Sequence, residues 1–170
     1  MSFSSKVKGE LSLHLGNGRH CEIAETAAIV NICGQIAVFG EYFCLKIHTE
    51  NFHVASKCFT LLKKTFNIDT DVFIRRNEYL KKSRTYEVVI QQEEDVIRVL
   101  QAIKLMDGSG KLPGNHAVIS NVILANSCCK RAFIRGAFLA AGSISAPEKF
   151  YHYEIVCTTQ EKAEQLKALI

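Results

Sequence analysis

Residues 128–142 read CCKRAFIRGAFLAAG and residues 20–34 read HCEIAETAAIVNICG, two Ala-rich segments that end at the matched glycines Gly142 and Gly34. Each glycine begins a Gly-x-Ile sequence. One constant offset in residue number aligns His20–Leu62 with Cys128–Ile170 without a gap, and seven of these 43 pairs are identical. Tyr42-Phe43 also falls on the aromatic pair Phe150-Tyr151. The chain is therefore predicted to contain an internal repeat, and the repeat decides its fold.

Each copy of the repeat reads as an apolar helix, a short strand, a turn, an alternating strand and an amphipathic helix. In the first copy Phe43, Leu45 and Ile47 alternate with polar residues, as in a strand with one buried face. The periodicities predict helices at Ser4–Leu15, Cys21–Cys33, Glu50–Phe66 and Glu93–Leu105, and strands at Gln35–Val38, Tyr42–Thr49, Asp71–Arg76 and Arg84–Gln91. This succession indicates an α+β fold built on antiparallel hairpins.

The two opening helices are rich in small residues. The second copy has Gly136, Ala137, Ala140 and Ala141, and the first copy has Ala24, Ala27 and Ala28. Helix axes approach most closely where the contacting side chains are small. We expect the two helices to pack side by side about an internal pseudo-twofold axis, although two separate Ala-rich core helices would fit the same composition.

Two such helices, each followed by a hairpin and a helix, resemble the LAGLIDADG homing endonucleases, whose motif would fall on Thr26–Gly34 and Ile134–Gly142. Further segments are similar to the WhiA family of bacterial regulators, namely SFSSKVK at 2–8, CCKRAFIRGAFL at 128–139, GS at 142–143, PEK at 147–149, YH at 151–152 and EIV at 154–156. The resemblance covers essentially the whole chain. It implies a LAGLIDADG homing-endonuclease-like fold with two pseudo-symmetric α-β-β-α repeats and saddle-shaped antiparallel sheets, and a role in sporulation or cell-division gene control.

The expected organisation is an N-terminal helix and turn at 1–20, a first repeat at 21–105, a linker at 106–127 and a second repeat at 128–170. The second repeat is expected to be truncated, because nothing in it corresponds to the second hairpin of the first copy. Members of the resembled family continue into a C-terminal helix-turn-helix domain, which we do not expect among these 170 residues.

The resemblance also indicates where catalysis would occur. In active members of the endonuclease family, the acid before the final glycine of each motif binds the catalytic divalent metal, and carboxylates suit such a metal. Cys33 and Ala141 hold these positions in this chain. We therefore expect no catalytic residues, no metal and no nuclease activity. An active endonuclease that uses displaced acids, such as Glu25 or Glu41, is the alternative from the enzyme class.

A basic cluster at Arg75–Arg84 is the candidate DNA-binding element. It holds five cations against one acid, Glu78, and the cations are Arg75, Arg76, Lys81, Lys82 and Arg84. On a hairpin such a cluster could neutralise several phosphates of double-stranded DNA and give salt-dependent, weakly specific binding. Lys46 and His48 are predicted on the polar face of their strand, and Lys46 is included as a further contact. A solvated turn is the alternative interpretation.

Composition sets wider limits. The formal charge of +4 permits a polyanionic partner without requiring one. The seven cysteines, with no apolar leader and no membrane-length apolar run, predict a cytoplasmic protein whose cysteines are buried small hydrophobes. The resemblance to a DNA-binding regulator adds the expectation that the protein is nucleoid-associated. The short spacings of common zinc sites are missing, so no structural zinc, other cofactor or small-molecule ligand is expected.

The favoured function is therefore a catalytically inert DNA-binding or scaffold domain of a transcription regulator. The alternatives are the active endonuclease and a protein-interaction module, whose saddle binds a protein partner in transcription or the rest of its own chain.

Overall fold

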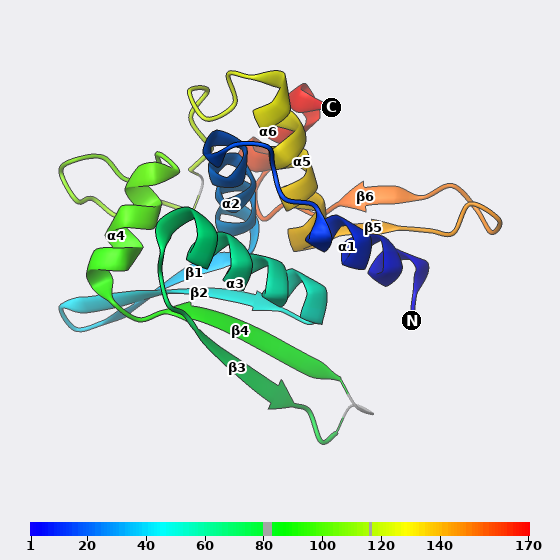
Figure 1. The fold of residues 1–170 in the computed structure, drawn as a ribbon, viewed down its shortest axis with the longest axis horizontal. Coiled ribbons are helices and arrows are strands. Elements are labelled where there is room, and N and C mark those ends of the chain that lie inside the picture. Colours follow the sequence, from blue (N-terminus) through cyan, green and yellow to red (C-terminus); the bar gives the residue numbers. More distant parts are fainter. Residues whose placement is uncertain (80–82, 116) are drawn as a thin grey trace.

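The computed structural model describes residues 1–79, 83–115 and 117–170, and its elements follow the expected alternation of helices and hairpins (Figure 1). In chain order they are α1 (Phe3–Leu13), α2 (Arg19–Cys33), β1 (Gly34–Phe39), β2 (Tyr42–Thr49), α3 (Phe52–Phe66), β3 (Asp71–Arg76), β4 (Arg84–Ile90), α4 (Glu93–Ala102), α5 (Ser127–Ala141), β5 (Gly142–Ile144), β6 (Tyr153–Ile155) and α6 (Gln160–Leu169).

The internal repeat is present in the structure with the offset read from the sequence. This offset carries both ends of α2 onto the ends of α5, and it carries the start of α3 onto the start of α6. The hairpin registers also coincide, because Gly34 pairs with Ile47 in the first copy and Gly142 pairs with Ile155 in the second. The prediction of two pseudo-symmetric α-β-β-α repeats is confirmed.

The strands form two antiparallel sheets. The first has four strands in the order β1-β2-β4-β3, and the second consists of β5 and β6. Helices α3 and α4 contact β2 and β4 and so cover one face of the larger sheet. The opposite face has no helix of the described structure over it and is called the open face below. Figure 1 shows α2 and α5 at the centre, with β5 and β6 extending away from the larger sheet.

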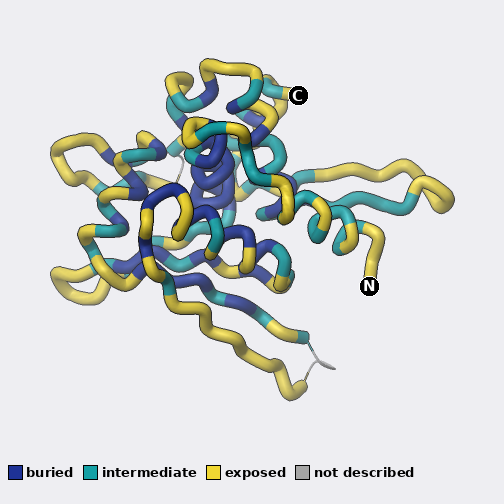
Figure 2. Tube along the Cα trace, viewed as in Figure 1, coloured by how far each residue is buried: buried dark blue, intermediate teal, exposed yellow. Residues whose placement is uncertain are grey.

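The core lies between the covered face of this sheet and the helices around it. Leu45, Ile47, Val88 and Ile90 point inward from β2 and β4, and all four are buried. They join a single cluster with Val54, Leu61 and Leu62 of α3 and Val96, Val99 and Leu100 of α4. In Figure 2 the central helices and the inner strands are buried, whereas β3 is exposed along its whole length.

The central helix pair packs through small residues, as predicted. Ala24, Ala28, Ala132 and Ala137 are essentially inaccessible to solvent. Gly136 is required for this approach, because a β-carbon there would lie 2.5 Å from the main-chain oxygen of Glu25. The two helices therefore touch almost backbone to backbone at this point.

The segment between α4 and α5, expected as a linker, packs against the core. Met106, Ile119 and Leu124 are buried in the main cluster. The side chain of Gln165 fixes Ile119 by donating to its carbonyl at 2.7 Å and accepting from its N–H at 3.0 Å. This part of the chain therefore joins the repeats through an ordered, buried contact.

The predicted helix Glu93–Leu105 ends earlier in the structure, at Ala102. Lys104 adopts the left-handed conformation, with φ of 60°. The N–H groups of Leu105 and Met106 both donate to the carbonyl of Leu100, which satisfies the end of α4 in the manner of a C-capping motif.

Candidate nucleic-acid interface

The predicted DNA-binding residues that the structure describes, Lys46, Arg75, Arg76 and Arg84, lie on two different faces of the larger sheet. Arg75 pairs with Thr85 across the β3-β4 hairpin, and Arg76 pairs with Arg84. Because successive side chains of a strand alternate, the register places Arg75 on the open face with Lys46. Arg76 and Arg84 lie together on the opposite, helix-covered side, and both are exposed there near the end of the hairpin.

Lys81 and Lys82 lie outside the described residues. On either side of them the hairpin is closed by a hydrogen bond of 3.1 Å from the N–H of Asn77 to the carbonyl of Ser83. Tyr79, on the near side of this gap, is 96% exposed.

The open face carries a shallow hollow of about 380 Å³. Its rim includes exposed aromatic rings, with Phe39, Tyr42 and Phe73 accessible over about half of their surface or more. Its lining mixes aromatic, aliphatic and charged residues, namely Phe39, Tyr42, Phe43, Cys44, Lys46, Phe73, Arg75, Glu87, Val89 and Gln91. The cations of this face were predicted from the sequence, whereas its aromatic residues were not.

The charges of the open face are partly paired with each other. Arg75 donates to Glu87 at 3.2 Å, but the Arg75 side chain is 71% exposed. Water therefore competes strongly for this arginine. His48 Nδ1 lies 3.9 Å from the same carboxylate. The Lys46 ammonium sits 5.8 Å from the centre of the Phe39 ring, within the range of a cation–π contact.

These contacts leave the cations able to exchange partners. An exposed ion pair contributes little stability, so a phosphate can replace Glu87 at Arg75 at small cost. The aromatic rings beside the cations add apolar surface that the sugars or bases of a nucleic acid can contact. Glu87 also lies on this face, and its negative charge lowers the positive potential there. No separate signal in the sequence pointed to this acid.

The ends of the two motif helices carry no carboxylate. Cys33 donates its thiol to the carbonyl of Ile29 at 3.3 Å, and burial raises its pKa to about 12 even though Lys8 acts in the opposite direction. Ala141, at the matched position, offers no ligand atom at all. Neither position can hold Mg²⁺ through an oxygen at neutral pH.

The two acids considered as displaced catalytic groups are placed elsewhere. Glu25 is fully buried between α2 and α5, where Arg135 holds both of its oxygens at 3.1 and 2.9 Å. Lys57 adds a third contact at 3.1 Å. Glu41 lies in the exposed turn between β1 and β2. Glu25 is therefore paired with two cations, Arg135 and Lys57.

Comparison with known proteins assigns the chain. Residues 19–106 match the model of the WhiA N-terminal LAGLIDADG-like domain, and residues 130–170 match the WhiA LAGLIDADG-like domain. The chain belongs to the WhiA family. A probable cell division protein WhiA from Lachnoclostridium phytofermentans is 47% identical over 171 residues, which span 100% of this chain and 54% of that protein. One from Alkaliphilus oremlandii is 37% identical over 172 residues, again 100% of this chain and 54% of the relative.

The chain thus spans about half the length of the curated WhiA proteins that it matches. Among solved structures, full-length DUF199/WhiA from Thermatoga maritima superimposes with a TM-score of 0.69 at 18% identity, over 99% of this chain and 49% of that one. The N-terminal LAGLIDADG domain of DUF199/WhiA gives 0.69 at 17% identity, over 99% and 72%. These likenesses show the predicted LAGLIDADG-like fold. Within the described residues, no helix has the length and apolar character needed to cross a bilayer.

Proposed function

We propose that this WhiA-family chain binds duplex DNA through the open face of its four-stranded sheet and has no nuclease activity. The observation that carries the proposal is the open face itself. It combines the exposed cation Arg75 and the partly exposed cation Lys46 with exposed aromatic rings, and no helix of the described structure covers it.

The backbone arrangement supports contact with a long, regular polyanion. Strand β3 is exposed in every residue, and the hairpin that it forms with β4 extends beyond the helices (Figure 2). A projecting ribbon of this kind can follow a groove or a phosphate backbone. The small net charge of +4 predicts weak, salt-sensitive affinity.

The lack of catalysis follows from the motif ends. Phosphodiester cleavage by the endonuclease mechanism needs carboxylate-bound metal to stabilise the attacking and leaving oxygens. Cys33 and Ala141 cannot supply the carboxylates, and Glu25 is neutralised by Arg135 and Lys57. The chain would then act as a regulator in the cytoplasm, on the nucleoid, in keeping with relatives named as probable cell division proteins.

Fluorescence anisotropy of a labelled duplex across a salt series tests the binding. A variant with four cations of the hairpin removed (Arg75→Ala, Arg76→Ala, Lys81→Ala and Lys82→Ala) is compared with wild type. Lys111→Ala with Lys167→Ala serves as a control that removes exposed charge outside the strands of the sheet. We expect a steep salt dependence in wild type and the control, and its loss in the hairpin variant. Absence of binding by wild type at low salt refutes the proposal.

Incubation of supercoiled plasmid with the protein and Mg²⁺ tests the second half of the proposal. We expect no nicking or linearisation, and cleavage that chelator abolishes would favour the active endonuclease instead.

The exposed aromatic rings of the open face also suit a protein partner. Binding of duplex that persists unchanged at high salt would contradict phosphate contact and favour such an apolar mode of recognition.

A further inference from the structure

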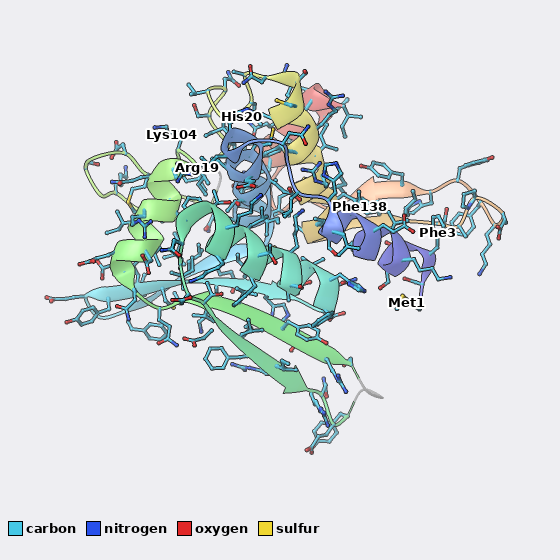
Figure 3. All side chains as sticks on the ribbon, in the orientation of Figure 1. Met1, Phe3, Arg19, His20, Lys104 and Phe138 are labelled. Atoms are coloured by element: carbon cyan, nitrogen blue, oxygen red, sulfur yellow. The ribbon has the colours of Figure 1, made fainter. Side chains whose placement is uncertain are left out.

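Four potential metal ligands meet at the end of the helix pair that lies farthest from the sheets. His20 and Cys21 are in the first turn of α2, and Cys128 and Cys129 are in the first turn of α5. One ligand atom from each residue lies within 4.8 Å of all the others. The Nδ1 atom of His20 is 3.2 Å from the sulfur of Cys21 and 3.4 Å from the sulfur of Cys129. Figure 3 shows His20 at this end of α2, beside α5.

The pseudo-twofold symmetry of the fold produces this arrangement. The offset in residue number that relates α2 to α5 places His20 on Cys128 and Cys21 on Cys129. Adjacent residues of a helical turn point about 100° apart, because the helix has about 3.6 residues per turn. Two facing helices can therefore each contribute two ligands to a point between them, and four ligands from two such pairs can surround one ion.

We propose that His20, Cys21, Cys128 and Cys129 bind one Zn²⁺ ion in a tetrahedral, structural site. Three thiolates and one imidazole are a common ligand set for structural zinc. Bond lengths of about 2.3 Å to sulfur and about 2.0–2.1 Å to nitrogen place neighbouring ligand atoms of a tetrahedron roughly 3.5–3.8 Å apart. The two measured sulfur–nitrogen distances are only slightly shorter, so closure on a metal needs small side-chain movements.

The surroundings of the cluster suit a metal better than simple core packing. Cys21 and Cys129 are buried beside Ala24 and Ala132, as small apolar residues would be. Apolar packing does not explain why an imidazole nitrogen points at both sulfurs. His20 is exposed and Cys128 is partly exposed, which gives an ion a route to the site.

Two further features hold the ligands in place. Both pairs lie at helix N-termini, where the helix dipole favours the negative charge of a thiolate. The loop before α2 passes close over the site, and a β-carbon on Gly16 would lie 2.6 Å from the β-carbon of Cys21. The loop therefore restricts the space around the Cys21 side chain.

A zinc ion here would fasten the starts of α2 and α5 to each other. Each helix is 15 residues long. At a rise of about 1.5 Å per residue, the site is about 20 Å from the helix ends that lead into the hairpins. The ion would fix the crossing of the helices, and so the orientation of the two hairpins, without contact with the open face. The site is also separate from Cys33 and Ala141, which stand at the motif positions where active endonucleases carry their metal-binding acids.

Metal titration of this chain tests the proposal. The protein is purified without a histidine tag, stripped with chelator in the presence of a reductant, and titrated with Co²⁺ and then Zn²⁺. We expect one equivalent of Co²⁺ to give thiolate charge-transfer absorption and the intense visible bands of a tetrahedral site, and Zn²⁺ to displace it. Elemental analysis of protein purified without chelator should show about one zinc per chain.

The variants distinguish this site from adventitious binding. Cys129→Ser and His20→Ala should each weaken zinc binding by at least about tenfold, the lower range seen even for residues that merely support metal ligands. His20 is exposed, so His20→Ala is expected to fold and keeps the test decisive. Cys157→Ser, which removes a cysteine outside the cluster, should bind zinc as wild type does.

Thermal unfolding gives a second readout. At a free zinc concentration about a thousandfold above Kd, the ion should raise Tm by roughly 10 °C in wild type and Cys157→Ser, but not in Cys129→Ser. Failure of the reduced wild-type chain to bind stoichiometric metal overturns the proposal. So does metal binding that His20→Ala and Cys129→Ser leave unchanged, because the ion would then lie elsewhere.

Discussion

Two matched double variants determine which face of the sheet meets DNA. Lys46→Ala with Arg75→Ala removes two positive charges from the open face. Arg76→Ala with Arg84→Ala removes the same charge from the helix-covered side of the same sheet. Both pairs change the net charge equally, so a difference between them reports position and not overall electrostatics. We expect the open-face variant to lose DNA affinity and the other to keep most of it.

The expected size follows from counterion release. Each phosphate contact contributes about 0.9 to the slope of log affinity against log salt concentration. Loss of two contacts lowers the slope by about 1.8. When salt rises about fourfold, for instance from about 50 to 200 mM, the affinity of wild type should therefore fall by a factor roughly ten times larger than the affinity of the variant does. The Arg75 side chain is 71% exposed. Its pairing with Glu87 therefore reduces the expected effect on DNA affinity only slightly, because an exposed ion pair is worth about 0.2–1 kcal/mol.

The assay is anisotropy of a labelled duplex at five or more salt concentrations, with circular dichroism to verify that both variants are folded. Equal slopes for the two variants would refute the assignment of the open face. A larger loss in the Arg76 and Arg84 variant would place the DNA on the opposite side of the hairpin.

Three further outcomes are expected. Glu87→Gln should tighten DNA binding about threefold at low salt, since a negative charge about 6 Å from a phosphate is repelled by roughly 0.7 kcal/mol in water. Weaker binding by this variant in the same titration would contradict the expectation. Gly136→Ala should lower the free energy of unfolding measured in urea. Overpacking against the Glu25 carbonyl costs about 1–3 kcal/mol, and the gain in helix propensity returns at most roughly 1 kcal/mol. Gly108→Ala, where the added β-carbon meets open space, should be near neutral. Arg135→Leu removes one of the two cations paired with the buried Glu25 and should lower the free energy of unfolding by about 3 kcal/mol. Arg135→Lys should recover part of that loss. An unchanged free energy of unfolding in Arg135→Leu would show that the ion pair is not needed for stability.

The sequence was sufficient for the order and type of the elements. Two strands, Tyr42–Thr49 and Asp71–Arg76, have the bounds that alternation predicted, and the helix pair follows the internal repeat. These features depend on local periodicity and on small residues at fixed spacing, which are properties of short stretches of chain. That Cys33 and Ala141 carry no carboxylate is likewise a matter of residue identity.

The placement of the candidate DNA contacts was only partly predictable. Lys46 and His48 share a face because residues two apart in a strand do so. The cluster Arg75–Arg84, however, reads as one basic patch in the sequence, and its described arginines divide between two faces in the fold. That division depends on which residues pair across the β3-β4 hairpin, and the register brings Arg76 opposite Arg84.

Two clusters came from the tertiary structure alone. Glu25 meets Arg135 and His20 meets Cys129, in both cases from one repeat to the other. No spacing rule links residues so far apart, so the short-range zinc patterns used to read cysteines could not detect the second group. The sequence by itself determined that α2 and α5 would be equivalent helices with small contact surfaces. The rotation of each helix about its own axis decides which side chains face each other. Close packing at Gly136 and the core around both helices set this rotation, so only the folded chain supplies the information.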